Sequence, residues 1–230
     1  MSSASSAWYD SPEVRSVDAT GTYYRCKSDI TVLPFEPVDP ASPKPEGHVR
    51  IVCISDTHSQ YLVVPDGDVL VHCGDWTKTG EPKQIEAFTS WFGSLPHPHK
   101  VCIAGNHDVS MHEEFYAENW SRFHRLRCEP ADVRAKVLAD TRFTYLEDSS
   151  VEIMGLKFYG SPWQPEFCNW AFNLDRGEPC AAKWRAIPED TDVLLTHGPA
   201  LAHGDLCLPG ELRAGCVDLL VEIERRIKPQ

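Results

Sequence analysis

Four short apolar runs, each leading directly into a polar loop, constrain this chain more than any other feature of its sequence. The runs are rich in β-branched residues, as buried strands are, and lie at residues 49–55, 68–73, 100–104 and 192–196. The loops that follow them contain, in order, Asp56, His58, Asp75, Asn106, His107 and His197. Because ligands of open α/β sheets bind outside the carboxyl ends of the strands, we expect these side chains to converge at one edge of a sheet.

Helical patterns and a hairpin lie between and after these runs. Pro82 opens a predicted helix, and three apolar side chains, Ile85, Phe88 and Phe92, share one face of it. Residues 151–159 have the pattern of a hairpin that turns near Gly155. A last helix carries an apolar stripe, formed by Cys216, Leu220, Ile223 and Ile227. The alternation of strands and helices predicts one α/β domain over residues 46–230.

The first 45 residues lack this alternation. Prolines recur there every two or three positions, at residues 34, 37, 40, 43 and 45. This spacing favours an extended chain over a packed domain. We therefore predict an extended, proline-rich lead-in over residues 1–45.

Charge and cysteine content bear on partners and compartment. Asp and Glu outnumber Lys and Arg by 34 to 22, for a net charge of -12, which argues against duplex nucleic acid or an anionic membrane as a partner. No window approaches 18 apolar residues, and residues 1–7 are neither basic nor strongly apolar, which favours a cytoplasmic protein. The nine cysteines include no C-x-x-C pair. We interpret Cys53, Cys73 and Cys102, each within a strand-like run, as buried small hydrophobes in a reducing compartment.

The polar loops offer atoms that bind divalent cations. Carboxylate, carboxamide and imidazole donors gathered at one sheet edge suit Mn²⁺, Fe²⁺ or Zn²⁺. Glycines stand beside Asp75, Asn106 and His197, where they let the backbone turn tightly around bound ions. The alternative is a set of capped turns with surface histidines. The ordered series, each member after a strand, favours the metal site.

These motifs carry a resemblance to a known family. The motif series resembles that of the calcineurin-like metallophosphoesterase superfamily, which is D-x-H, then G-D, then G-N-H-D, and finally His-Gly after a strand. The stretches at residues 55–59, 104–108, 159–165 and 196–199 resemble its brain- and development-associated branch of metallophosphoesterase-domain-containing proteins. The similarity covers residues 38 to 230. It implies an α/β sandwich of two mixed β-sheets flanked by helices.

The resemblance also implies a division of labour among the residues. Asp56 and His58 would hold one divalent metal ion, Asn106 and His197 the other, and Asp75 would bridge both. Two such ions share and acidify a hydroxide and hold the phosphate oxygens. His107 would stabilise or protonate the leaving group. Asp108 would fix the tautomer of His107 or, alternatively, cap the helix that follows.

Several other side chains have competing interpretations. Trp163, Trp170 and Phe172 could stack a nucleobase or simply pack a loop, and we carry Trp163, with Asn106 and His107, as a candidate contact to substrate. His72 lies in an apolar strand, which is typical of a hydrogen-bonded core histidine. His203 is predicted to be an ordinary loop residue.

The predicted function is metal-dependent hydrolysis of a phosphoester. Gly74-Asp75 is followed by Trp-Thr-Lys-Thr and not by the Asp-Arg-Gly that protein phosphatases of the superfamily usually have. We therefore expect a phosphodiesterase that acts on a small or cyclic nucleotide. The alternative, from a different class, is a catalytically impaired relative that binds a nucleotide or a partner protein.

One motif of the superfamily has no counterpart in this sequence. The resemblance implies a final Gly-His-x-His, on a strand after the last helix, that donates one imidazole to each metal. The sequence stops at Gln230 without it. The expectation is therefore a domain that is incomplete at its C-terminus, binds metal weakly, and leaves a sheet edge open to self-association.

Overall fold

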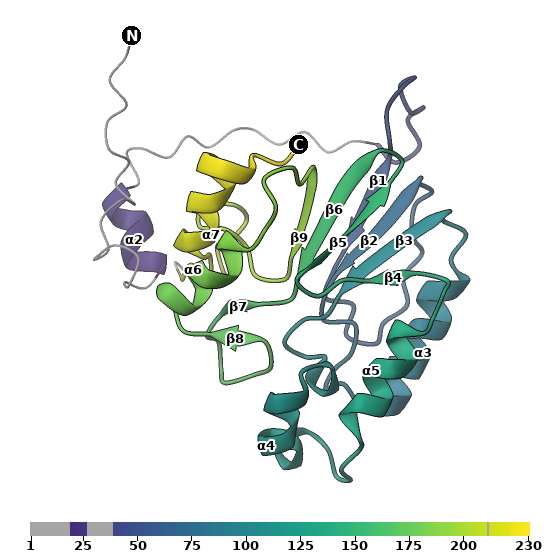
Figure 1. Cartoon of the computed structure of the whole chain (residues 1–230), viewed down its shortest axis with the longest axis vertical. Coiled ribbons are helices and arrows are strands. Elements are labelled where there is room, and N and C mark those ends of the chain that lie inside the picture. Colours follow the sequence, from purple (N-terminus) through teal and green to yellow (C-terminus); the bar gives the residue numbers. More distant parts are fainter. Residues whose placement is uncertain (1–18, 27–38, 211) are drawn as a thin grey trace.

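Four parallel strands form the first sheet. The computed structural model describes residues 19–26, 39–210 and 212–230. Its first sheet contains, in spatial order, β1 (Ile51–Ile54), β2 (Val69–Cys73), β3 (His99–Ile103) and β4 (Thr144–Tyr145) (Figure 1). All three pairings are parallel. Because the carboxyl ends of parallel strands point the same way, the loops after β1, β2 and β3 leave the sheet at one edge.

The second sheet contains the predicted hairpin. β5 (Ser149–Ile153) runs antiparallel to β6 (Leu156–Ser161), and β6 pairs in parallel with β9 (Val193–Thr196). The hairpin turns through Met154 and Gly155 at φ angles of 54° and 77°, the left-handed conformation that two-residue turns require. A short separate parallel pair is formed by β7 (Gln164–Pro165) and β8 (Asn173–Leu174).

Helices cover the outer face of each sheet (Figure 1). The first sheet carries α3 (Pro82–Ser94) and α5 (Pro130–Leu138), with η3 (Val109–Met111) and α4 (Glu113–Phe123) beyond its carboxyl edge. The second carries α6 (Glu178–Arg185) and α7 (Val217–Glu222), which continues into η4 (Ile223–Ile227). The order of layers is therefore helix, sheet, sheet, helix.

Three apolar clusters correspond to the three interfaces between these layers. Alternate residues of β2 divide between two of them: Leu70 packs beneath α3, while Val69 and Val71 pack against the second sheet. Phe158 joins the cluster between the sheets, and Trp184 of α6 joins the third cluster. The period-two alternation of a strand buried on both faces thus builds the core.

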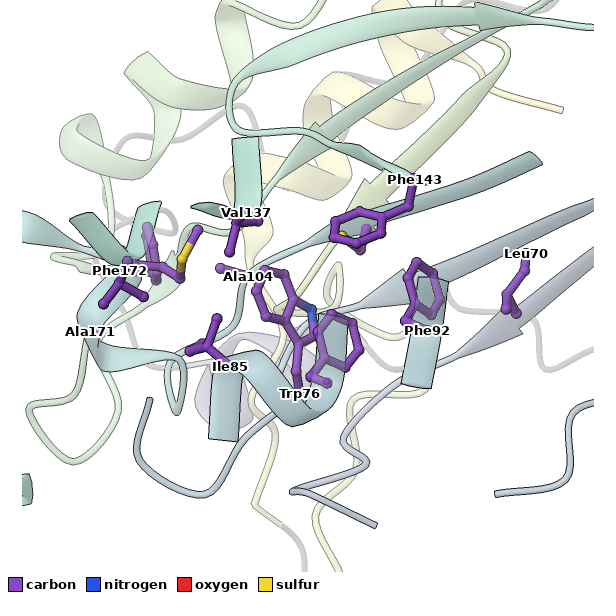
Figure 2. Packing of buried hydrophobic residues seen from close by; sticks show 13 residues of the cluster. Leu70, Trp76, Ile85, Phe92, Ala104, Val137, Phe143, Ala171 and Phe172 are labelled. Carbon is purple, nitrogen blue, oxygen red and sulfur yellow. The ribbon is translucent and has the colours of Figure 1, made fainter. Parts of the chain in front are cut away.

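An aromatic group fixes the segment that follows Asp75. Trp76 is fully buried and stacks on Phe88 of α3 with ring centroids 4.6 Å apart. Phe88 in turn stacks on Phe92 at 5.2 Å. Figure 2 shows Trp76 and Phe92 among the side chains of this cluster. The loop after β2 is therefore anchored by one of the largest side chains of the core.

The predicted α/β sandwich of two sheets flanked by helices is confirmed, with one refinement. The first sheet is parallel throughout, and only the second is mixed. The predicted helix with Ile85, Phe88 and Phe92 on its buried face is confirmed as α3. No helix among the described residues has the length and apolar character to cross a membrane.

Two expectations about burial were wrong. Cys102 is buried, but Cys73 is half-buried and Cys53 is exposed. Cys53 lies opposite Val71 on β1, the terminal strand of the first sheet.

The lead-in is not extended throughout. Within it, α2 (Ala19–Cys26) is helical, in a stretch without proline. Ala19 is buried in the third apolar cluster beside α6 and α7, and Tyr23 packs against the same cluster. Residues 1–18 and 27–38, which include Pro34 and Pro37, lie outside the described part of the chain.

Candidate metal centre

The polar residues after the four strands line one cavity. Its volume is 470 Å³. The predicted side chains on its wall are Asp56, His58, Asp75, Asn106, His107 and His197. The convergence expected from their positions in the sequence is therefore observed. Asp75 and Asn106 are buried, with 3% and 6% exposure, whereas Asp56 is exposed at the mouth.

The loops that carry these residues are held together by backbone contacts. Asp56 N donates to Gly74 O at 3.0 Å, and His58 N donates to Asp75 O at 3.0 Å. His107 N donates to Asp75 Oδ1 at 2.8 Å, which ties the loop after β3 to the loop after β2. Asp56, His58 and Asp75 all have left-handed backbones, with φ of 54°, 43° and 56°. Such strained conformations in residues other than glycine gather at functional sites.

Two glycines make room for the side chains. A Cβ on Gly74 would lie 2.6 Å from His197 Nδ1, and one on Gly105 would lie 2.3 Å from Asp75 Oδ1. Gly74 also has a φ of 98°, which disfavours any other residue. The glycines of the G-D and G-N-H motifs therefore allow Asp75 and His197 to approach the backbone closely.

Backbone carbonyls fix the tautomer of all three histidines. The Nδ1 atoms of His58, His107 and His197 lie 3.2, 2.7 and 2.9 Å from the carbonyl oxygens of Thr77, Lys78 and Cys73, respectively. A carbonyl oxygen only accepts hydrogen bonds, so each Nδ1 must donate. In the neutral ring, the Nε2 atom then carries a lone pair.

Those three lone pairs face one carboxylate. The Nε2 atoms of His58, His107 and His197 lie 3.7, 4.0 and 3.3 Å from the carboxylate oxygens of Asp75. His197 Nε2 also lies 2.9 Å from Asn106 Oδ1, another acceptor. These atoms repel one another unless a cation lies between them. Protonating every ring would crowd positive charges, since the His58 and His107 ring centroids are 4.5 Å apart. A divalent metal ion serves all these donors at once.

The donors form two groups that share Asp75. Within each group, the ligand atoms lie within 4.8 Å of one another. The first group is His58, Asp75 and His107, and the second is Asp56, Asp75 and His197. The shared member is the residue that the resemblance expects to bridge two ions. The grouping also differs from the expected division, because His107 lies with His58. The residues present fit divalent metal ions.

Two neighbouring side chains stay neutral beside this site. Burial raises the pKa of the Cys73 thiol to about 12, so it offers no thiolate at ordinary pH. Burial, with repulsion from His197 and His58, lowers the pKa of His72 to about 3. His72 Nε2 lies 3.0 Å from Thr57 Oγ1 beneath the site, as predicted for a core histidine. The available donors are thus nitrogen and oxygen, which suits the predicted metals.

Asp108 plays neither of the two roles predicted for it, because it does not fix the His107 tautomer and, although it is the N-cap residue of η3, it makes no side-chain capping hydrogen bond. It is fully buried, and its oxygens accept hydrogen bonds from the backbone N atoms of Gly105, Trp76 and Thr77 at 2.9, 3.2 and 3.0 Å. The Thr77 hydroxyl adds a fourth at 2.8 Å. The contact to His107 Nδ1 is made by Lys78 O instead. Burial, followed by the charge of Asp75, raises the pKa of Asp108 to about 7.

Trp163 also lies elsewhere. Its Nε1 donates to Asp148 Oδ2 at 3.0 Å, and it borders a separate cavity with His112 and Glu147. Trp170 is the tryptophan beside the metal centre, stacked on His107 with centroids 4.0 Å apart. His203 is exposed and outside the cavity, as predicted.

Several residues on the cavity wall belong to none of the motifs that predicted the site. Gln164 lines the cavity and donates to Asn106 Oδ1 at 3.0 Å. It lies within residues 159–165, a stretch that resembles the metallophosphoesterase-domain-containing proteins. Arg176 and Arg213 also line the cavity. Arg176 donates to the carbonyls of Gly215 and Ala214, and Arg213 donates to the carboxylate of Asp205.

Comparison with known proteins identifies the family. A two-sheet α/β sandwich with a histidine and aspartate cluster at its carboxyl edge defines the class of fold and site. Residues 49–222 match the sequence profile described as calcineurin-like phosphoesterase. The chain belongs to this family.

Curated relatives agree with this assignment. Metallophosphoesterase domain-containing protein 1 of Homo sapiens is 42% identical over 204 residues, which cover 85% of this chain and 62% of the relative. UPF0046 protein T07D4.2 of Caenorhabditis elegans is 36% identical over 227 residues, covering 93% of this chain and 57% of the relative. The chain thus spans about three fifths of the length of these relatives. A solved structure aligns with a TM-score of 0.51 over 78% of this chain and 80% of that one, and its 12% identity shows the fold alone.

Proposed function

We propose that this chain forms the catalytic core of a metal-dependent phosphodiesterase that acts on a small or cyclic nucleotide. The observation that carries the proposal is the set of three imidazole Nε2 atoms directed at the buried carboxylate of Asp75. Membership of the calcineurin-like phosphoesterase family supports phosphoester hydrolysis. Two divalent cations, Mn²⁺, Fe²⁺ or Zn²⁺, would be held by Asp56, His58, Asp75, Asn106 and His197, with His107 close by.

His107 is the candidate catalytic residue. Bound divalent cations would supply Lewis acidity, which neutralises charge on the phosphate and acidifies the attacking water. His107 Nδ1 donates to Lys78 O, so Nε2 is a free base in the neutral ring, and only when the ring is protonated can Nε2 deliver a proton to the leaving oxygen. Stacking on Trp170 and the edge contact with His58 hold the ring in this orientation.

The remainder of the cavity supports a small diester in preference to a phosphoprotein. Beyond the metal centre its wall includes the apolar residues Pro165, Phe167, Pro199 and Leu212. Phe167 and Leu212 are 53% and 58% exposed, so both can pack against the second ester group of a substrate. Arg176 donates to two backbone carbonyls and Arg213 to Asp205, and these protein contacts compete with the binding of a phosphate monoester by either guanidinium.

The competing function is binding without turnover. A catalytically impaired relative would use the same cavity to hold a nucleotide or a partner protein. Two measurements distinguish these functions. They are the metal content of the protein and its rate of hydrolysis of bis(para-nitrophenyl) phosphate, with Mn²⁺ and with a chelator. We expect weakly bound metal and slow, Mn²⁺-dependent hydrolysis of this diester that still exceeds hydrolysis of para-nitrophenyl phosphate. Metal binding without hydrolysis would favour the binding relative, and absence of both would refute the metal centre.

His107→Ala tests the catalytic assignment. We expect diester turnover to fall by about 10²–10⁴-fold, the usual worth of general acid catalysis, while metal content stays near that of the wild type. His203→Ala is the matched control, because His203 is exposed and does not line the cavity. Loss of metal in the His107→Ala protein, measured by elemental analysis, would show that His107 is a ligand.

A further inference from the structure

Gln164 occupies a fixed position beside the predicted metal ligand Asn106. It begins β7, is 9% exposed, and lines the cavity. Its Nε2 donates to Asn106 Oδ1 at 3.0 Å and to Asn173 Oδ1 at 3.1 Å. Both hydrogens of the amide are therefore used, and the orientation of the carboxamide is determined.

The contact to Asn106 decides which atom of that carboxamide faces the site. An Asn side chain can present either its oxygen or its NH₂ group, and only the oxygen binds a metal ion. Reversing Asn106 would set its NH₂ against the NH₂ of Gln164 and leave a buried donor without an acceptor, which disfavours the reversed orientation. A carbonyl oxygen has two lone pairs, so accepting from Gln164 leaves one for the site.

Gln164 also packs against the residue after His197. A Cβ on Gly198 would lie 2.7 Å from Gln164 Cβ, so the His-Gly pair fits only because Gly198 has no side chain. The same glutamine thus touches Asn106 through a hydrogen bond and the backbone next to His197 through packing. Asn106 and His197 are the residues expected to hold the second metal ion.

A partly buried network holds Gln164 in place from the other side. The preceding residue, Trp163, donates to Asp148, which also accepts from Lys183 Nζ at 2.6 Å and Ser161 Oγ at 2.8 Å. The backbone N of Gln164 donates to Phe172 O at 3.0 Å. The segment therefore has little freedom to shift.

We propose that Gln164 is a positioning residue that orients the Asn106 carboxamide so that its oxygen faces the metal centre. This inference rests on the proposed metal-dependent function. Outer-shell partners of metal ligands are typically worth about 10–100-fold in metal affinity or activity. Gln164 does not contact the predicted catalytic His107, so its effect should appear in metal binding before any change in the chemical step.

The first experiment measures Mn²⁺ affinity by titration calorimetry on the wild type and on Gln164→Leu, which removes both donors. We expect affinity to fall by about 10–100-fold. His203→Ala is the control, because His203 is exposed and does not line the cavity, and it should leave affinity near that of the wild type. The melting temperature of each metal-free protein shows that the fold is intact. If Gln164→Leu does not fold, Gln164→Met, which keeps the unbranched stem, takes its place.

A double-mutant cycle identifies the route of the effect. If Gln164 acts through Asn106, the Gln164→Leu/Asn106→Ala protein should bind Mn²⁺ no more weakly than Asn106→Ala alone. Additive losses would overturn the inference, as would equal affinity in the wild type and Gln164→Leu. A wild-type chain that binds no metal would overturn the proposed function and this inference together. If the wild type binds metal and the variants do not behave as expected, only the inference about Gln164 fails.

Discussion

Asp75 is the side chain around which the site is organised. It is 3% exposed, accepts from His107 N at 2.8 Å, and has His197 Nε2 at 3.3 Å. Its left-handed backbone, with φ of 56°, is a conformation that typically costs about 1–3 kcal/mol. The fully buried Trp76 that follows it supplies the packing that maintains this conformation.

Asp108→Asn tests whether Asp108 is structural. Four donors converge on its carboxylate, two on each oxygen. Asparagine has only one acceptor oxygen, so its NH₂ group would face two donors. We expect the free energy of unfolding to fall by about 2–4 kcal/mol, measured by chemical denaturation at neutral pH. Asp66→Asn is the control, because Asp66 is exposed and should change stability little. Unchanged stability in Asp108→Asn would return Asp108 to the catalytic candidates.

At the scale of single residues, the sequence predicted the cavity wall but not its supports. Motif residues such as Asp75 and His197 are recognisable because their types and order are specific. The backbone carbonyls of Cys73, Thr77 and Lys78 fix the histidine tautomers. Every residue type has a backbone carbonyl, so the sequence could not predict these contacts. Gln164 had no signal because one glutamine is uninformative until the fold brings it to Asn106.

Among the structural elements, β6 shows how closely the two sheets approach. A Cβ on Gly160 would lie 2.5 Å from Ile103 Cγ2 of β3 and 2.6 Å from Leu146 Cβ. The glycine therefore allows β6 to pack directly on the first sheet. The cluster between the sheets includes Ile103, Leu146 and Phe158, all buried.

Gly160→Ala should separate these strands. We expect a loss of about 1–3 kcal/mol in the free energy of unfolding, because an added methyl group in a filled core forces neighbouring side chains to move. Urea denaturation measures it, with Ser150→Ala, on the exposed part of the partner strand β5, as the control. A stabilised Gly160→Ala protein would mean that the sheets have room between them.

His72 on β2 should make stability depend on pH. Burial lowers its pKa to about 3, whereas an unfolded histidine titrates near its usual value of about 6.5. Below 6.5 the unfolded chain binds a proton that the folded chain does not. Stability should therefore fall as pH drops from about 6.5 toward 3, by up to about 1.4 kcal/mol per pH unit. His72→Leu should show a flatter dependence in that window, measured by urea denaturation at successive pH values. Parallel curves for the two proteins would contradict a neutral buried His72.

Long, periodic elements were predictable, and short ones were not. The spacing of Ile85, Phe88 and Phe92 predicted α3, and Gly155 predicted the hairpin turn. β4, β7 and β8 are two residues each, too short for an alternating pattern, and they form only because distant segments pair with them. Cys53 is exposed because it lies on β1, the strand at the end of the first sheet. The spacing of apolar residues along a strand does not predict the order of strands in a sheet.

For the whole molecule, the sandwich brings residues from both sheets to one place. Asp56, Asp75 and Asn106 follow strands of the first sheet, and His197 follows β9 of the second. The metal centre therefore depends on how the two sheets dock. Binding of a cation there should stabilise the docked arrangement as a unit, because the ligands belong to both sheets.

This dependence predicts that divalent metal raises the thermal stability of the entire fold. A ligand at 100 times its dissociation constant stabilises by about 2.7 kcal/mol, and for a chain of this size about 1 kcal/mol shifts the melting temperature by roughly 2–4 °C. We therefore expect saturating Mn²⁺ to raise the melting temperature by roughly 5–10 °C over the chelated protein. Differential scanning calorimetry measures the shift, and Mg²⁺, which binds imidazole poorly, serves as the control ion. His197→Ala should remove most of the increase, since it deletes the ligand from the second sheet. A shift that survives in His197→Ala would mean that the cation binds to one sheet alone.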